Sequence, residues 1–208
     1  MITYDERAEK PSLHPRHPIV CLLDIGGILS TLFFLLQSAH WVNRTYLASI
    51  VLLYLVSATY HWCVHKDWLR RLDHIMIFVV IAMTAIPYWG VITPFAWRPA
   101  GPLIIATLII FGAIIKFFDF FSKGVSGGLY ILSGLPIVTF FLLHWSEVPS
   151  PFNLLWAIGS CLYLFQLLIY TFHWFNFKTE ILGYREIQHC VLLMATSLHS
   201  YTAVELVG

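Results

Sequence analysis

The sequence contains seven long apolar stretches that are separated by short polar segments. The stretches cover residues 19–40, 45–64, 74–93, 101–121, 127–145, 152–173 and 184–207. A helix of about 20 residues is as long as the hydrocarbon core of a bilayer is thick. Strands of a membrane barrel would alternate apolar and polar residues over about ten positions, and these stretches show no such alternation. The sequence therefore predicts an all-α protein, a bundle of seven transmembrane helices.

The composition agrees with lipid as the surrounding solvent. Hydrophobic residues make up 59% of the chain and charged residues only 11%, whereas soluble domains average about 45–50% and 25%. A chain with so few polar residues cannot cover its surface in water. We expect residues 1–18 to form a short polar arm and residues 19–208 to form a single transmembrane domain. No basic patch, Walker loop or dinucleotide fingerprint occurs in the sequence, so nucleic-acid and nucleotide partners are excluded.

The distribution of lysine and arginine predicts how the bundle is oriented. If the N-terminus is cytoplasmic, the cytoplasmic side carries Arg7, Lys10, Arg16, Lys66, Arg70, Arg71, Lys116, Lys123, Lys178 and Arg185. The opposite side then carries only Arg44 and Arg98. Cytoplasmic loops of membrane proteins are enriched in positive charge. We therefore predict a cytoplasmic N-terminus and an extracytoplasmic C-terminus, and the short chain without a signal peptide favours a bacterial inner membrane.

Polar side chains gather at the predicted cytoplasmic ends of three stretches. Ser57 and His61 lie one helical turn apart at the end of the second stretch, and Asp73 adjoins the start of the third. Arg185 and His189 lie one turn apart at the start of the seventh stretch. Ionisable side chains within a membrane are costly and usually mark a functional site. The shared depth of His61, Asp73 and His189 predicts that these three residues converge.

The same residues resemble the motifs of the hemolysin III family. The resemblance is carried by the Ser-x-x-x-His of Ser57 and His61, by the segment LDHIMIF at 72–78, and by the His-x9-His of His189 and His199. It covers the chain from residue 19 onward. This family is grouped with the progestin/adiponectin-receptor (PAQR) proteins and, more remotely, with the alkaline ceramidases. The resemblance implies seven helices and one zinc ion near the cytoplasmic side.

The resemblance also implies a role for each site residue. It assigns His61 and His189 as zinc ligands and Asp73 as the carboxylate that holds the zinc-bound water. The third imidazole of the family would stand at position 185, where this chain has arginine. Catalytic zinc usually has three protein ligands and a water, and a guanidinium has no lone pair to donate. Arg185 therefore alters the site and weakens the expected zinc binding.

Three arrangements of the site remain open. In the first, Asp73 becomes a direct ligand and completes a zinc site with His61 and His189. In the second, Arg185 forms a salt bridge with Asp73, the two histidines are hydrogen-bond partners, and no metal is needed. In the third, Arg185 extends into water and leaves an empty polar site. Ser57 either contributes to the site or bonds a carbonyl of its own helix.

Two classes of function follow from these arrangements. The first is a hemolysin III-type membrane protein that has membrane lipids as its partners and serves lipid or energy homeostasis. The second is a zinc-dependent hydrolase of lipid amides or esters, in which Asp73 is the general base and Ser57 assists it. Arg185 favours the first class. A lytic pore is a weaker third candidate because no charged stripe follows the apolar stretches.

Overall fold

The computed structural model describes residues 17–62, 66–92, 100–118, 123–172 and 183–207. All regular elements in these ranges are helices, which confirms the all-α prediction. The helices are α1 (Pro18–Gln37), α2 (Trp41–Trp62), α3 (Asp67–Met83), α4 (Ile86–Ile92), α5 (Ala100–Phe118), α6 (Lys123–Leu143), α7 (Phe152–Phe172) and α8 (Tyr184–Val207), with one turn of 3₁₀ helix, η2 (Trp145–Glu147). Of the predicted arm at 1–18, residues 1–16 lie outside the described residues, and Pro18 begins α1.

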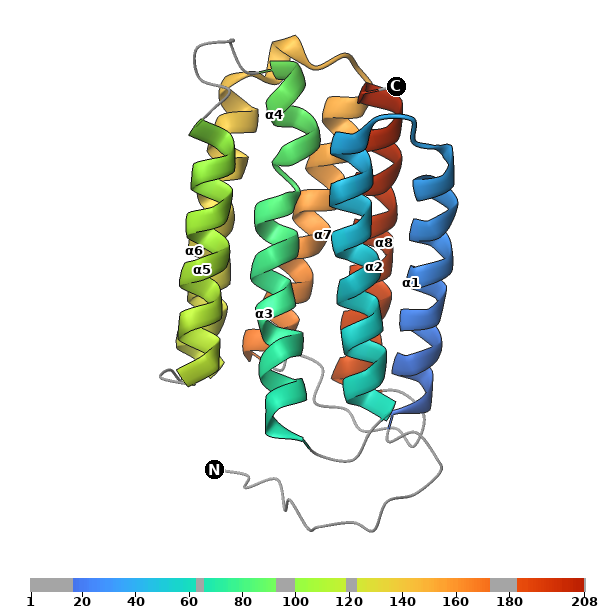
Figure 1. The fold of residues 1–208 in the computed structure, drawn as a ribbon, viewed down its shortest axis with the longest axis vertical. Helices are drawn as coiled ribbons and strands as arrows, with labels where there is room; N and C mark the ends of the chain where they lie inside the picture. The colour runs from blue at the N-terminus through green and yellow to red at the C-terminus, as the bar shows by residue number, and fades with distance from the viewer. Residues whose placement is uncertain (1–16, 63–65, 93–99, 119–122, 173–182, 208) are drawn as a thin grey trace.

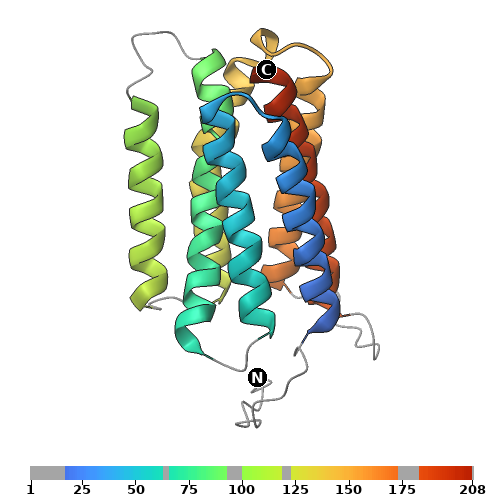
Figure 2. The ribbon, with the colours of Figure 1, turned by 45° about the vertical axis from the view of Figure 1, so that its right-hand side comes forward.

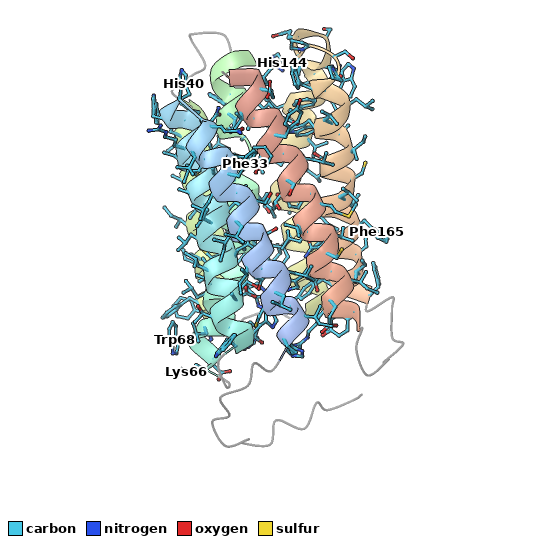
Figure 3. All side chains as sticks on the ribbon, turned by 90° about the vertical axis from the view of Figure 1, so that its right-hand side faces the viewer. Phe33, His40, Lys66, Trp68, His144 and Phe165 are labelled. Carbon is cyan, nitrogen blue, oxygen red and sulfur yellow. The ribbon has the colours of Figure 1, made fainter. Side chains whose placement is uncertain are left out.

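The long helices stand side by side along the long axis of the molecule (Figure 1). α1 packs against α2 and α8, α3 packs against α2, α5 and α6, and α7 packs against α6 and α8. α5 lies at the edge of the bundle, where it contacts α3 and α4 (Figure 2). Lys66 and Trp68 lie at one end of the bundle, and His40 and His144 lie at the other (Figure 3). Below, these are called the Lys66 end and the His40 end.

Six helical segments of the described chain are long and apolar enough to cross a membrane, if α3 and α4 are taken together as Asp67–Trp89. Their outer surfaces carry large apolar side chains, such as Leu36, Leu143 and Leu103, which are at least 70% exposed. Lipid explains this exposure, because a soluble protein would bury most of these surfaces. α8 is 24 residues long and more polar. The seventh span and the orientation of the termini stay predictions.

The third predicted span, 74–93, differs from the structure. The helix begins earlier, at Asp67, and is interrupted after Met83, where Thr84 and Ala85 separate α3 from α4. Pro87 explains the interruption because its ring has no N–H to donate and would clash with the carbonyl four residues earlier, at Met83. The break directs α4 toward the His40 end of the bundle (Figure 1).

The pair Asn43–Arg44, which the sequence suggested as a connector, lies instead in the first turn of α2. Asn43 is fully buried and its Nδ2 donates a 2.9 Å hydrogen bond to the carbonyl of Ala203 on α8. Arg44 Nε donates to the carbonyl of Ser38 at 2.9 Å. Tertiary and capping hydrogen bonds thus replace the turn that these polar residues favour in isolation.

Two glycines allow helices to approach closely. A Cβ at Gly27 would lie 2.5 Å from the ring of Tyr54, so α1 can contact α2 only without a side chain there. A Cβ at Gly112 would lie 2.2 Å from Phe78, which sets the approach of α5 to α3. Small residues of this kind are common where membrane helices pack.

Candidate functional site

The rings of His61 and His189 meet in the interior near the Lys66 end of the bundle. His61 lies in the last turn of α2 and His189 in the second turn of α8, and both are buried. Their ring centroids are 5.0 Å apart and their planes nearly perpendicular. α1 packs against both helices. The structure therefore brings together the two histidines that the sequence singled out.

A carboxylate from α1 holds one of these rings in place. Asp24 Oδ1 lies 2.8 Å from His189 Nδ1, and Asp24 is 0% exposed. A carboxylate only accepts hydrogen bonds, so Nδ1 of His189 donates, and in the neutral ring Nε2 keeps its lone pair. This is the arrangement in which histidines bind metals, with the other ring nitrogen held by an acceptor. Among the described residues, Asp24 Oδ2 has no hydrogen-bond partner.

Asp73 and Ser57 complete the inner part of the site. The Ser57 hydroxyl lies near enough to the Asp73 carboxyl to act on it. His189, Asp24 and Arg185 are all close enough to act electrostatically on the Asp73 carboxyl. Ser57 is buried, and the Asp73 carboxyl near it belongs to α3. The three residues predicted to converge, His61, Asp73 and His189, lie in one region of the bundle, and Ser57 lies with them.

Arg185 lies on the outer side of this group. Its Nη1 donates to Nε2 of His17 at 2.8 Å, and its Nε donates to the hydroxyl of Tyr184 at 3.1 Å. The ring of His17 is in turn 5.5 Å from that of His61. Within the described residues, the structure records no ion pair between Arg185 and Asp73. A series of contacts therefore runs from Arg185 through His17 and the two buried histidines to Asp24.

Sequence reasoning missed two members of this series. Asp24 is the only acidic residue in the apolar helix α1, and the cost of burying a charge in a membrane was the signal that could have found it. His17 fell within the predicted polar arm and carried no comparable signal. Its Nδ1 also lies 3.9 Å from Glu186 Oε1, so the start of α8 holds the start of α1.

The donor types at this site suit zinc, since they include imidazoles and carboxylates. His189 is oriented for ligation, and Asp24 Oδ2 is a buried acceptor without a partner. Even so, no three His, Cys, Asp or Glu side chains of the described chain stand close enough together to hold one ion. The side chains at this site are therefore of the types that bind zinc, and His189 is oriented to do so. A third donor is not in position to complete the site.

Other polar residues that the sequence noted lie elsewhere. His199 is buried 5.2 Å from the ring of Tyr163, far along α8 from His189. The ring of His74 packs edge-on against Tyr170. Lys116 lies over the ring of Tyr130. Asp119 follows it by three residues, a spacing that predicts an ion pair on one helix face, but Asp119 is outside the described residues.

These observations define the class of protein. It is an integral membrane helical bundle with a buried His–Asp group near one end. The chain belongs to the haemolysin III-related family, because the sequence model of that family matches residues 16–200. Membership of the wider PAQR superfamily is consistent with this match. No solved structure shows a significant match to this fold.

Proposed function

We propose that this chain is a bacterial inner-membrane protein of seven spans that contributes to membrane lipid or energy homeostasis through the site near the Lys66 end. The observation that carries the proposal is the 2.8 Å bond between Arg185 Nη1 and His17 Nε2. It puts a permanent positive charge beside the two buried histidines, at the position where the family resemblance implies an imidazole. The site is thus suited to an anionic group and only weakly to zinc.

The location of the site supports a lipid as its ligand. His61 and His189 are buried, whereas His17, Tyr184 and Arg185 are partly exposed at the end of the bundle. Lysine and arginine are concentrated at this end, which supports a location at the cytoplasmic leaflet under the positive-inside rule. Lipid headgroups with phosphate or carboxylate groups lie at that depth, and a guanidinium binds both groups through paired hydrogen bonds.

A second candidate, a zinc-dependent hydrolase of lipid amides or esters, is favoured by the Asp24–His189 bond. That bond leaves Nε2 of His189 ready to bind a metal, and the Ser57–Asp73 pair provides a carboxylate near it. Bound zinc would polarise a carbonyl and lower the pKa of water. In this candidate Asp73 accepts a proton and Ser57 orients its carboxylate.

The test is the lipid composition of cells that lack the chain and of cells that express it. We expect expression of the wild type to change the lipid profile, and His61→Ala and Arg185→Ala to abolish that change. Arg44→Ala, near the His40 end, is the matched control and should behave as the wild type. An identical profile with and without the wild-type chain would refute the proposal. Zinc-dependent release of fatty acid by the purified wild type would favour the hydrolase instead.

A further inference from the structure

Buried polar atoms without hydrogen-bond partners are concentrated away from the site described above. Of the ten such side-chain atoms in the described chain, seven lie on α2, α4, α7 and α8. They are Asn43 Oδ1, Tyr46 Oη, Tyr88 Oη, Trp156 Nε1, Tyr163 Oη, His199 Nδ1 and Ser200 Oγ. Buried polar groups in proteins are nearly always hydrogen-bonded. A concentration of exceptions in one place therefore points to an occupant.

Five of these side chains form a closed series of contacts, which we call the polar ring: Tyr46, Tyr88, Trp156, Tyr163 and His199. The ring centroid of His199 is 5.2 Å from Tyr163 and 5.6 Å from Trp156. Trp156 is 6.0 Å from Tyr88. Tyr46 closes the series because its hydroxyl lies near those of Tyr88 and Tyr163. The Tyr46 and Tyr163 hydroxyls approach each other without reaching the distance and angle of a hydrogen bond.

The polar ring is shielded from the outside of the bundle. Tyr46, Tyr88, Trp156 and His199 are each at most 3% exposed. The unpartnered atoms come from four different helices, α2, α4, α7 and α8.

The chemistry of the polar ring limits what it can bind. The indole N–H of Trp156 only donates, while the phenols and the imidazole nitrogen can donate or accept. None of the five side chains is a carboxylate, an ammonium or a guanidinium, and a buried ion without a countercharge is strongly disfavoured. The suitable occupant is a small neutral group with an oxygen that accepts several hydrogen bonds.

We propose that the polar ring is an internal binding site for a neutral oxygen acceptor, separate from the His61–His189 group. Two sources share this chemistry. One is internal water, which typically makes about three hydrogen bonds to buried polar groups. The other is the carbonyl or hydroxyl oxygen of a lipid. Either occupant links α4 to α2, α7 and α8.

Removal of single hydroxyl groups tests the site, because the proposal predicts that each removal lowers the unfolding temperature. Tyr46→Phe, Tyr88→Phe and Tyr163→Phe each remove one oxygen and keep the aromatic ring. If an occupant bonds these hydroxyls, each variant should unfold about 2–4 °C below the wild type, since a hydrogen bond is lost. Tyr201→Phe, on the exposed side of α8, is the control and should not change. Unfolding temperatures that are unchanged or higher in all three ring variants would overturn the proposal.

A high-resolution experimental structure and native mass spectrometry distinguish the two sources. Rounded oxygen density within hydrogen-bond distance of at least three ring members, without a lipid adduct, identifies water. Elongated density, with a bound lipid mass that Tyr163→Phe loses, identifies a lipid. Direct hydrogen bonds between ring members, with no density between them, would exclude the site.

Discussion

Asp24 on α1 and His189 on α8 are joined by a 2.8 Å hydrogen bond between Oδ1 and Nδ1. The bond connects the first and last described helices, and Asp24 is fully buried. The bond fixes the tautomer and the orientation of His189. It also joins α1 to α8, the helix that carries His189. Site chemistry and bundle stability depend on the same bond.

We predict that Asp24→Ala lowers the free energy of unfolding by about 1–3 kcal/mol, because it leaves a buried imidazole N–H without an acceptor. His189→Ala should have a similar effect, since it leaves the Asp24 carboxylate unpaired. The measurement is thermal unfolding of the purified protein in detergent. Glu205→Ala, at an exposed position of α8, serves as the control and should be nearly neutral.

A variant that carries both Asp24→Ala and His189→Ala shows whether the two losses of unfolding free energy come from the same hydrogen bond. For a direct bond, the combined loss should be smaller than the sum of the two single losses, with a coupling of about 0.5–3 kcal/mol. Strictly additive losses would contradict the bond.

The sequence located much of this site because membrane depth is readable from apolar stretches. Ser57, His61, Asp73 and His189 could be placed near one end of the bundle from their distance to the ends of their helices alone. Depth does not specify which neighbour a side chain meets, because that depends on the rotation of each helix about its axis. For this reason the hydrogen bond from Arg185 to His17, and the pairing of Asp24 with His189, needed the structure.

The same limit applies to the fold. The predicted stretch 184–207 coincides with α8, since its ends carry clear polar residues. The break between α3 and α4 was missed because 74–93 is continuously apolar, and hydropathy does not register the clash that Pro87 causes. Asn43 was assigned to a connector because its partner, the carbonyl of Ala203, is distant in sequence.

The contact between Gly27 and Tyr54 predicts a position that tolerates no side chain. Gly27→Ala would place a Cβ 2.5 Å from the Tyr54 ring, and overpacking of this kind costs about 1–3 kcal/mol. Gly128→Ala is the matched control, because open space surrounds that position within α6. It should be neutral or stabilising by about 0.5–1 kcal/mol. Equal unfolding temperatures for the two variants would show that α1 and α2 do not pack this closely.

The positive-inside asymmetry predicts the side on which the chain ends. A reporter that is active only outside the cytoplasm, fused after Gly208, should be active, and a reporter active only in the cytoplasm should be silent. The reason is the ten-to-two excess of lysine and arginine on the predicted cytoplasmic side. The reverse pattern in a full-length, membrane-inserted fusion would mean that the orientation or the span count is wrong.

Replacement of Arg185 by histidine should restore zinc binding. Position 185 is one helical turn before His189, so an imidazole there would lie on the same face of α8. The substitution supplies a third neutral donor and removes a positive charge that repels a metal cation at short range. We expect zinc well below one ion per chain in the wild type, after a wash with a mild chelator, and close to one ion per chain in Arg185→His. Elemental analysis of the purified proteins gives both values.

Arg44→His, near the opposite end of the bundle, controls for the addition of a histidine and should leave the zinc content unchanged. Stoichiometric zinc in the wild type would contradict the prediction and would indicate that Asp73, Asp24 or His17 acts as the third ligand. Equal and negligible zinc in the wild type and in Arg185→His would show that the site has lost zinc for reasons beyond this residue. In that case the Asp24–His189 pair stabilises the bundle without serving a metal.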